Sequence, residues 1–352
     1  MKWSFGKTIK GQIGVAFIDG GLTIGQCNWR NGQYVSPKIY HVEQGAELFT
    51  SESYRDAIHE AKVSGSDCIV SLPSSILHHQ ILRLPEMQIT ELKEAVSWEM
   101  AERLGIKRNE LQTDAIAIGK SGEVLGFAIE KNVLEGILDP MYVAGLRPTC
   151  IQANGISLCN TFSMLHRRES DQNQVRSILN FGSLNSSLLI IEGNRLAFFK
   201  SLSFKGVDLR ESIKKHTGVT FSQATQMLDS TRVNNSDLEI CKAVRDATRS
   251  FHEEIAVDVV KCLRHYGVTN RAPLSSCLCI TGSEGCNQFL AEILSNACNQ
   301  EVLADHQLDH INTVPNEILS IPGWNVVFGA SLAKLHLSPK VRDNDAYSKA
   351  AA

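Results

Sequence analysis

A glycine-hinged pair of strands occurs twice in this chain, and it constrains the fold more than any other feature. The first pair spans residues 13–24 and the second spans residues 177–191. Such a hairpin cradles phosphate when an acidic residue near its turn orients Mg²⁺ or a water molecule. Ala16 and Asn180 stand in those two acidic positions here. The pattern therefore predicts the scaffold of a nucleotide-binding protein whose phosphate chemistry has been lost.

The composition is that of a packed globular protein, because 43% of the 352 residues are hydrophobic and 21% are charged. A formal net charge of −3, with scattered basic residues, offers no electrostatic surface for nucleic acid. No run approaches about 18 apolar residues, and Asp19 interrupts the apolar segment after the basic start, so neither a membrane span nor a signal peptide is expected. Ten dispersed cysteines without a CxxC motif are typical of reduced, buried thiols. We therefore expect a cytoplasmic protein.

The order of predicted elements is the same in the two halves of the chain. The first half gives three strands, a helix and a strand, at residues 12–18, 22–29, 34–42, 53–63 and 68–73. The second half gives strands at 177–181, 187–192 and 195–204, helices at 208–216 and 222–228, a long helix ending at Gly267 and a strand at 276–281. This shared pattern predicts two related domains.

A segment between the two halves belongs to neither repeat. It gives a strand at 78–84, a helix at 90–104 and a hairpin of strands at 113–118 and 124–129, which together form a compact β-α-β-β subdomain. The predicted first domain consists of residues 1–75 and 149–176, with the inserted subdomain at 76–148. The predicted second domain is residues 177–337, and it includes a last amphipathic helix at 324–337. The tail at 338–352 is predicted to be disordered.

Trp98 lies off the apolar stripe of the helix at 90–104, which carries Leu92, Val96 and Met100. It therefore needs a second surface to cover it. Contact with the neighbouring subdomain is the simpler interpretation. A role in binding a partner is the alternative, since exposed aromatic residues often anchor interfaces.

Other motifs for catalysis or metal binding are incomplete. The segment 282–285, Gly-Ser-Glu-Gly, is one residue short of the GxSxG nucleophile motif and is more simply a strand-to-helix turn whose amides could meet a ribose or adenine. His306 and His310 have helical spacing, but Gln307 replaces the glutamate that a zinc protease needs. The start at residues 6–8, Gly-Lys-Thr, lacks the strand and first glycine of a phosphate loop. We expect no catalytic residue and no metal site.

Several short segments together follow the pattern of one known family. They are the strand at 13–16, the blocks at 70–73, 81–85 and 91–96, the strand end at 180–182, the turn at 282–283 and the helix at 329–333. In these segments the chain resembles the PilM family, the actin-like cytoplasmic proteins of type IV pilus assembly, and their relatives FtsA and MshI. The resemblance runs from Ile13 to about Leu335, over most of the chain.

This resemblance implies an α/β, actin-like (ASKHA) two-domain fold with duplicated β-β-β-α-β halves and an inserted β-α-β-β subdomain. It places the family's nucleotide cleft at six positions: Gly14, Ala16, Asn180, Gly182, Gly282 and Ser283. Two of them replace aspartates and the last replaces a glycine. Losing a carboxylate removes a charge-assisted contact to metal or water, so the cleft is interpreted as degenerate, as in MshI, and no cofactor is expected. Binding of ATP is the alternative.

The function implied by the resemblance is a non-catalytic scaffold of a type IV pilus machine, of the MSHA type for an MshI-like member. Such a scaffold lies in the cytoplasm against the inner membrane, where a groove between the first domain and the inserted subdomain holds the cytoplasmic N-terminal segment of a PilN-like, single-span membrane protein. Trp98 is the candidate contact for that segment. An ATP-binding actin-like ATPase and a GspL-like component of type II secretion are the alternatives, and self-association is left open.

Overall fold

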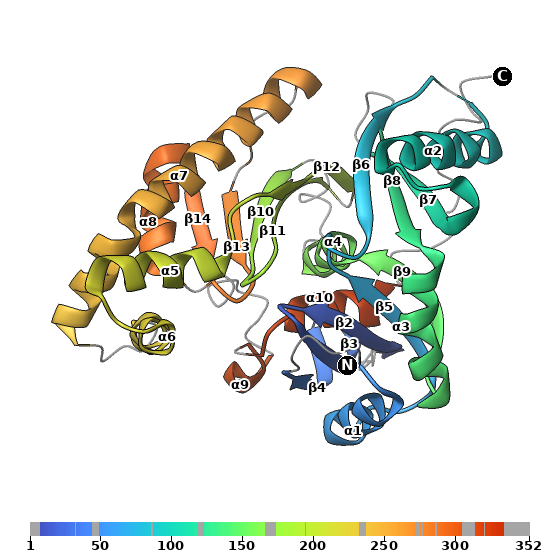
Figure 1. Ribbon diagram of the computed structural model, residues 1–352, viewed down its shortest axis with the longest axis horizontal. Coiled ribbons are helices and arrows are strands. Elements are labelled where there is room, and N and C mark those ends of the chain that lie inside the picture. Colours follow the sequence, from blue (N-terminus) through green and yellow to red (C-terminus); the bar gives the residue numbers. More distant parts are fainter. Residues whose placement is uncertain are drawn as a thin grey trace, which may run out of the picture. The chain divides into compact units, whose positions relative to one another are not determined.

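The computed structural model describes residues 8–31, 33–43, 49–85, 87–118, 123–165, 174–193, 195–231, 237–271, 275, 277–285, 287–304, 314–319 and 321–333 (Figure 1). The chain divides into two compact units, of which the first comprises Met1–Gln172, Gly193–Ala197 and Asn312–Ala352 and the second comprises Asn173–Glu192 and Phe198–Ile311. The tail predicted to be disordered, at 338–352, lies outside the described residues. Within those residues, no helix is both long and apolar enough to cross a membrane.

One sheet forms the centre of the first unit. Its order is β4 (Gln33–Val42), β3 (Gly21–Arg30), β2 (Ile13–Ile18), β5 (Asp67–Leu72) and β9 (Arg147–Ala153), and the short β1 (Ile9–Lys10) also pairs with β3. Strand β2 is antiparallel to β3 and parallel to β5. Consecutive residues of β2 and β5 are buried, so both faces of the sheet are covered at its centre, as their continuous apolar sequences indicate. Helix α1 (Ser51–Ala61) packs near β4 and β3.

The sheet of the second unit has the same strand order. It reads β12 (Arg195–Leu202), β11 (Ser186–Glu192), β10 (Val175–Phe181), β13 (Cys277–Thr281) and β14 (Glu301–Ala304). Here too the first strand of the half is central, antiparallel to the strand that follows it and parallel to the strand after the helices. The prediction of two related halves is therefore confirmed at the level of topology.

Four helices accompany this second sheet: α5 (Gly206–Thr217), α6 (Phe221–Ser230), α7 (Leu238–Asn270) and α8 (Gln288–Cys298). The buried stripe of α7 includes Ile255, Val259 and Tyr266, as its periodicity predicts. The predicted end at Gly267 is wrong, because the helix continues to Asn270. Arg271 takes the left-handed conformation, with φ of 47°, and its amide closes the last turn on the carbonyl of Gly267.

The inserted subdomain has the predicted β-α-β-β order. Helix α2 (Ile89–Leu104) covers a three-stranded antiparallel sheet of order β6 (His78–Arg83), β8 (Glu123–Glu130) and β7 (Leu111–Ile118), and the 3₁₀ turn η1 (Arg108–Glu110) precedes β7. Gly126 lets the helix approach, since a Cβ there would lie 2.8 Å from Cγ1 of Val96. The core between helix and sheet consists of buried apolar side chains, among them Leu82, Met100 and Val124.

Residues 131–165 carry elements that the sequence analysis did not predict. Helix α3 (Lys131–Val143) follows β8, and helix α4 (Asn154–Leu165) follows β9. Strand β9 starts inside the segment assigned to the insertion and pairs in parallel with β5, at the edge of the main sheet. Because α3 packs against α1, β8 and β9, it joins the insertion to the main sheet of the same unit.

The last helix lies in a different place from the predicted one. It was predicted to belong to the second domain, but α10 (Trp324–Ser331), which follows the short α9 (Asn316–Leu319), packs on β2, β3 and α4 of the first unit. Two glycines allow this close packing. A Cβ on Gly329 would lie 1.9 Å from the carbonyl oxygen of Ser157, and one on Gly14 would lie 2.2 Å from that of Val327. The amide of Gln12 also donates to the carbonyl of Ser331, at 2.9 Å.

Candidate functional site

Two of the six positions predicted to form a nucleotide cleft lie on β2 of the first unit. Ala16 is fully buried and is paired across the sheet with Thr23 and Ser71. Gly14 has a structural reason of its own, which is the approach of α10 described above. Gly14 is therefore required for packing against α10, whether or not the turn after β2 binds a nucleotide.

The other four predicted positions come together in the second unit, where β10 and β13 end. Asn180 stands opposite Thr281 in the parallel register, so Gly182 and Gly282 follow at the same edge. Gly282 has φ of +96°, and a Cβ there would lie 2.8 Å from Oδ1 of Asn180. Ser283 follows directly, and its buried Oγ has no hydrogen-bond partner among the described residues. We call residues 180–185 and 281–285 the turn cluster.

A buried ion pair crosses the turn cluster, and the sequence analysis missed it. Arg210 on α5 donates from Nη1 to Oε1 of Glu284 at 2.8 Å, and the same nitrogen donates to the carbonyl of Gly206 at 2.8 Å. The Glu284 side chain is completely buried and that of Arg210 is 11% exposed. The two residues are 74 positions apart, so no local spacing could have revealed the pair.

The amino end of α5 is also engaged by the turn cluster. The amide of Gly206 donates to the carbonyl of Gly182 at 2.9 Å, and the amide of Val207 donates to that of Ser183 at 3.0 Å. A helix binds phosphate through its free N-terminal amides. These two amides are already paired, and the carboxylate of Glu284 beside them is occupied by Arg210. The second unit thus offers a poor cradle for phosphate at this end of α5.

Metal ligation finds no support in the part of the chain that the structure describes. No group of three or more histidine, cysteine or acidic side chains lies close enough there to hold a metal ion. His306 and His310 lie outside the described residues.

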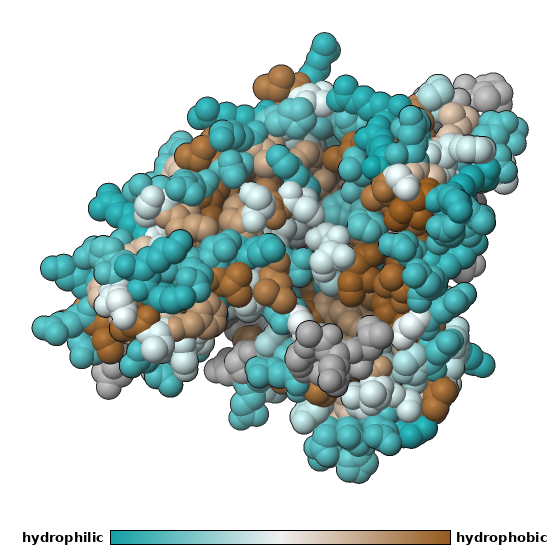
Figure 2. All heavy atoms as spheres, in the orientation of Figure 1, coloured by the Kyte–Doolittle hydropathy of each residue, from teal (hydrophilic) through white to brown (hydrophobic). Residues whose placement is uncertain are grey.

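A cavity lies within the first unit, between the inserted sheet and the edge of the main sheet. Its volume is about 570 Å³, and β7, β8, α3, β9 and the start of α4 supply its walls. We call it the insertion groove. Its apolar lining comes from all of these elements: Ile116, Phe127, Ile129, Leu134, Leu138, Ile151 and Ile156, together with Leu77. Figure 2 shows hydrophobic side chains gathered near β9 on the face that it presents.

Two strand edges border the insertion groove. Strand β7 ends the order of the three-stranded sheet and β9 ends the order of the main sheet, so each is paired on one side only among the described strands. Edge strands present unpaired N–H and C=O groups that can accept another strand. Both strands supply lining residues, including Gln112 and Thr113 from β7 and Thr149 and Gln152 from β9.

The insertion groove carries little net charge. Asp114 is its charged lining residue, and Nζ of Lys93 lies 2.9 Å from the carboxylate. Cys150 also lines the groove, and partial burial raises the pKa of its thiol, with a further increase from the charge of Asp114. Because only the thiolate is a strong nucleophile, this cysteine is unsuited to nucleophilic chemistry at neutral pH.

Trp98 is in neither of these places. It is 62% exposed on the outer face of α2, and the guanidinium carbon of Arg108 lies 4.9 Å from its ring centroid. Arg108 is held there by its Nε, which donates to Oγ of Ser97 at 3.2 Å. The expectation that the neighbouring subdomain covers Trp98 is therefore wrong. The partial cover comes from an arginine of the same subdomain through a cation–π contact.

No family model and no curated protein matches the chain. Among solved structures it is similar to a chain of the PilM-PilN type IV pilus biogenesis complex, with a TM-score of 0.69 and 17% identity over 92% of this chain and 98% of that one. It is also similar to the ethanolamine utilization protein EutJ from Carboxydothermus hydrogenoformans, with a TM-score of 0.50 and 11% identity over 90% of this chain and 89% of that one. The fold is actin-like.

The predicted actin-like topology is thus confirmed, while the predicted site residues divide among three places. Four lie in the turn cluster, two lie on β2, and Trp98 lies on the exposed face of α2. The insertion groove lies where the family resemblance led us to expect a partner. Its lining residues were not predicted individually, because α3 and β9 were absent from the expected elements.

Proposed function

We propose that this actin-like chain is a non-catalytic scaffold of a type IV pilus assembly machine, acting in the cytoplasm at the inner membrane. It holds the cytoplasmic N-terminal segment of a PilN-like, single-span membrane protein in the insertion groove. The likeness to a chain of the PilM-PilN complex supports the system and the kind of partner. The MSHA type of pilus is the finer part of this proposal and rests on the degenerate loops.

The observation that carries the proposal is an apolar groove bordered by two open strand edges. A peptide that adds to a sheet edge gains main-chain hydrogen bonds, and its alternate side chains reach the apolar wall. Strand β9 has seven residues, so its edge matches an extended segment of roughly six or seven residues at about 3.3 Å each. The volume of about 570 Å³ is enough for several anchor side chains.

The weak charge of the groove selects among peptides. Asp114 is already paired with Lys93, so a charged anchor would lose its hydration without gaining an unpaired partner. The segment that fits best has apolar residues on the side that faces Leu134 and Leu138.

The non-catalytic part of the proposal is supported by the turn cluster and by β2. Ala16 and Asn180 provide no carboxylate for a metal or a water molecule. The first amides of α5 are used by the cluster itself, and Glu284 places a buried carboxylate among them. An active ATPase is the competing function, and it requires these positions to bind magnesium and phosphate.

A binding experiment tests the proposed partner. A synthetic peptide covering the cytoplasmic N-terminus of a PilN-like protein from the same genome is titrated by fluorescence anisotropy. Leu138→Ser removes an apolar contact from the groove and should weaken binding about tenfold. Val133→Ser, on the same helix but 40% exposed and outside the lining, is the matched control and should leave binding unchanged. Equal binding by both variants would show that the groove is not the site.

A further inference from the structure

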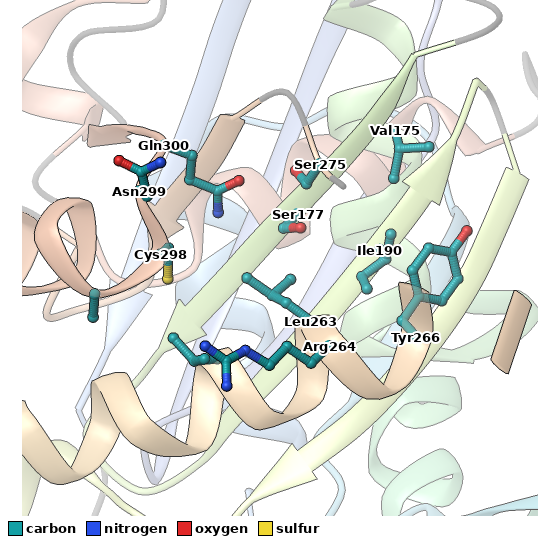
Figure 3. A pocket seen from close by; sticks show the side chains of 12 residues that line it. Val175, Ser177, Ile190, Leu263, Arg264, Tyr266, Ser275, Cys298, Asn299 and Gln300 are labelled. Atoms are coloured by element: carbon teal, nitrogen blue, oxygen red, sulfur yellow. The ribbon is translucent and has the colours of Figure 1, made fainter. Parts of the chain in front are cut away.

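A second cavity lies within the second unit, at the end of the sheet opposite the turn cluster (Figure 3). Its volume is about 200 Å³. The start of β10, the facing part of β11, the last third of α7 and the connection from α8 to β14 form its walls. Because β10, β13 and β14 are parallel, these walls gather at the amino ends of the strands. We call this space the α7 cavity.

Two polar atoms in the α7 cavity have no partner among the described residues. They are Oγ of Ser177, whose side chain is completely buried, and Nε2 of Gln300. Buried polar atoms in folded proteins nearly always find a hydrogen-bond partner. The amide nitrogen of Gln300 can only donate, so it requires an acceptor, while the hydroxyl of Ser177 can donate or accept. Two such atoms in one cavity require an occupant, water or ligand, that carries an acceptor (Figure 3).

Most of the remaining lining is hydrocarbon, and Ser275 and Asn299 are further polar residues in it. Val175, Ile190, Val260 and Leu263 face it, together with the side chain of Tyr266. A buried water molecule needs two to four polar partners, and an apolar cavity of about 150 Å³ stays dry and takes up benzene. Water can satisfy the polar end of the α7 cavity but not its apolar part. A molecule with an apolar body of about six carbons and one acceptor group fits both parts.

The charge at the mouth of the cavity decides which acceptor is preferred. Arg264 lines the cavity, is exposed, and makes no hydrogen bond or ion pair with any other described residue. The carboxyl end of α8 is also nearby and carries a partial negative charge of about half a unit. A full positive charge outweighs this partial one. A carboxylate therefore gains a charge-assisted hydrogen bond that a neutral carbonyl lacks.

We propose that the α7 cavity is a binding site for a small monocarboxylate with a hydrocarbon body of about six carbons. Gln300 and Ser177 bind the carboxylate oxygens and Arg264 supplies the countercharge, while Val260 and Leu263 contact the hydrocarbon. The site is separate from the insertion groove and does not depend on the function proposed for it.

Benzoate and 4-methylpentanoate are the probes, with benzyl alcohol as the uncharged control, titrated against the full chain and followed by backbone amide chemical shifts. We expect saturable binding of both carboxylates below about 10 mM, with shifts at Ser177 and Gln300, and affinity for benzyl alcohol lower by about tenfold. No saturable binding of either carboxylate in that range would overturn the proposal and leave water as the occupant.

Two pairs of variants test the named contacts. Ser177→Ala should weaken benzoate binding about fivefold, whereas Ser186→Ala removes another buried, unpartnered hydroxyl outside the cavity and should have no effect. Arg264→Gln should weaken benzoate about tenfold without changing benzyl alcohol, and Lys261→Gln on the same helix should change neither. Benzoate binding that survives both Ser177→Ala and Arg264→Gln unchanged would overturn the assignment.

Discussion

Removal of the arginine from the buried ion pair of the turn cluster should destabilise the second unit strongly. Arg210→Met keeps most of the aliphatic volume but leaves the fully buried carboxylate of Glu284 without its cation. Breaking a buried pair in this way costs about 3–5 kcal/mol. The hydrogen bond from Arg210 to the carbonyl of Gly206, within the first turn of α5, is lost as well, together with the bond to Glu284 that ties α5 to the cluster. We therefore expect the free energy of unfolding of Arg210→Met to fall by at least about 3 kcal/mol.

Urea unfolding followed by circular dichroism measures the effect, with Arg249→Met as the matched control. Arg249 pairs with Glu253 at 3.0 Å, but the two side chains are 71% and 54% exposed, so its removal should cost less than about 1 kcal/mol. The double variant Arg210→Met, Glu284→Leu removes both charges and should recover most of the stability lost in the single variant. An Arg210→Met protein within about 1 kcal/mol of the parent would refute the account of a desolvated, tightly coupled pair.

Three further predictions concern other positions. Burial lowers the pKa of His252 to about 4, below its usual 6.5, so the folded state binds fewer protons than the unfolded state. The free energy of unfolding should therefore fall by about 3 kcal/mol as the pH drops from about 6.5 to about 4. Urea unfolding at the two pH values measures this fall, which His252→Gln should lose. Gly329→Ala should cost at least about 2 kcal/mol, because its Cβ meets the Ser157 carbonyl, while Gly136→Ala in α3, with open space around it, should stabilise by about 0.5–1 kcal/mol; thermal melting compares the two. Calorimetric titration with Mg-ATP should give no binding tighter than about 10 μM, near −7 kcal/mol, and tighter binding would contradict the degenerate-loop interpretation.

The elements predicted correctly are those with a strong local signal. The predicted strands of both sheets run apolar between turn residues, and the buried residues of α7 repeat at helical spacing. Strands β1, β9 and β14 were not predicted. Helix α3 was missed because Gly136 and Pro140, two poor helix formers, lie inside it and because its exposed residues include Val133 and Tyr142. These residues obscure the amphipathic pattern that would have predicted a helix.

The remaining errors concern contacts between distant parts of the chain. Helix α10 packs on the first unit because Gly14 of β2 and Gly329 of α10 allow close approach to neighbouring backbone. These contacts exist only in the folded chain, so the sequence of α10 alone did not assign it to the first unit. The Arg210–Glu284 pair likewise depends on the turn after β13 reaching α5. Periodicity correctly put Trp98 off the core stripe of α2, but it could not show that Arg108 would stack on the ring.

Hydrogen exchange of the whole chain, with and without the PilN-like peptide, tests the central claim most directly. If the peptide adds as a strand in the insertion groove, saturating peptide should slow exchange of amides in β7 and β9, the two edges that border it, and leave β12 and β14 of the second unit unchanged. Saturable binding without slower exchange in β7 or β9, or with protection confined to the second unit, would contradict the account.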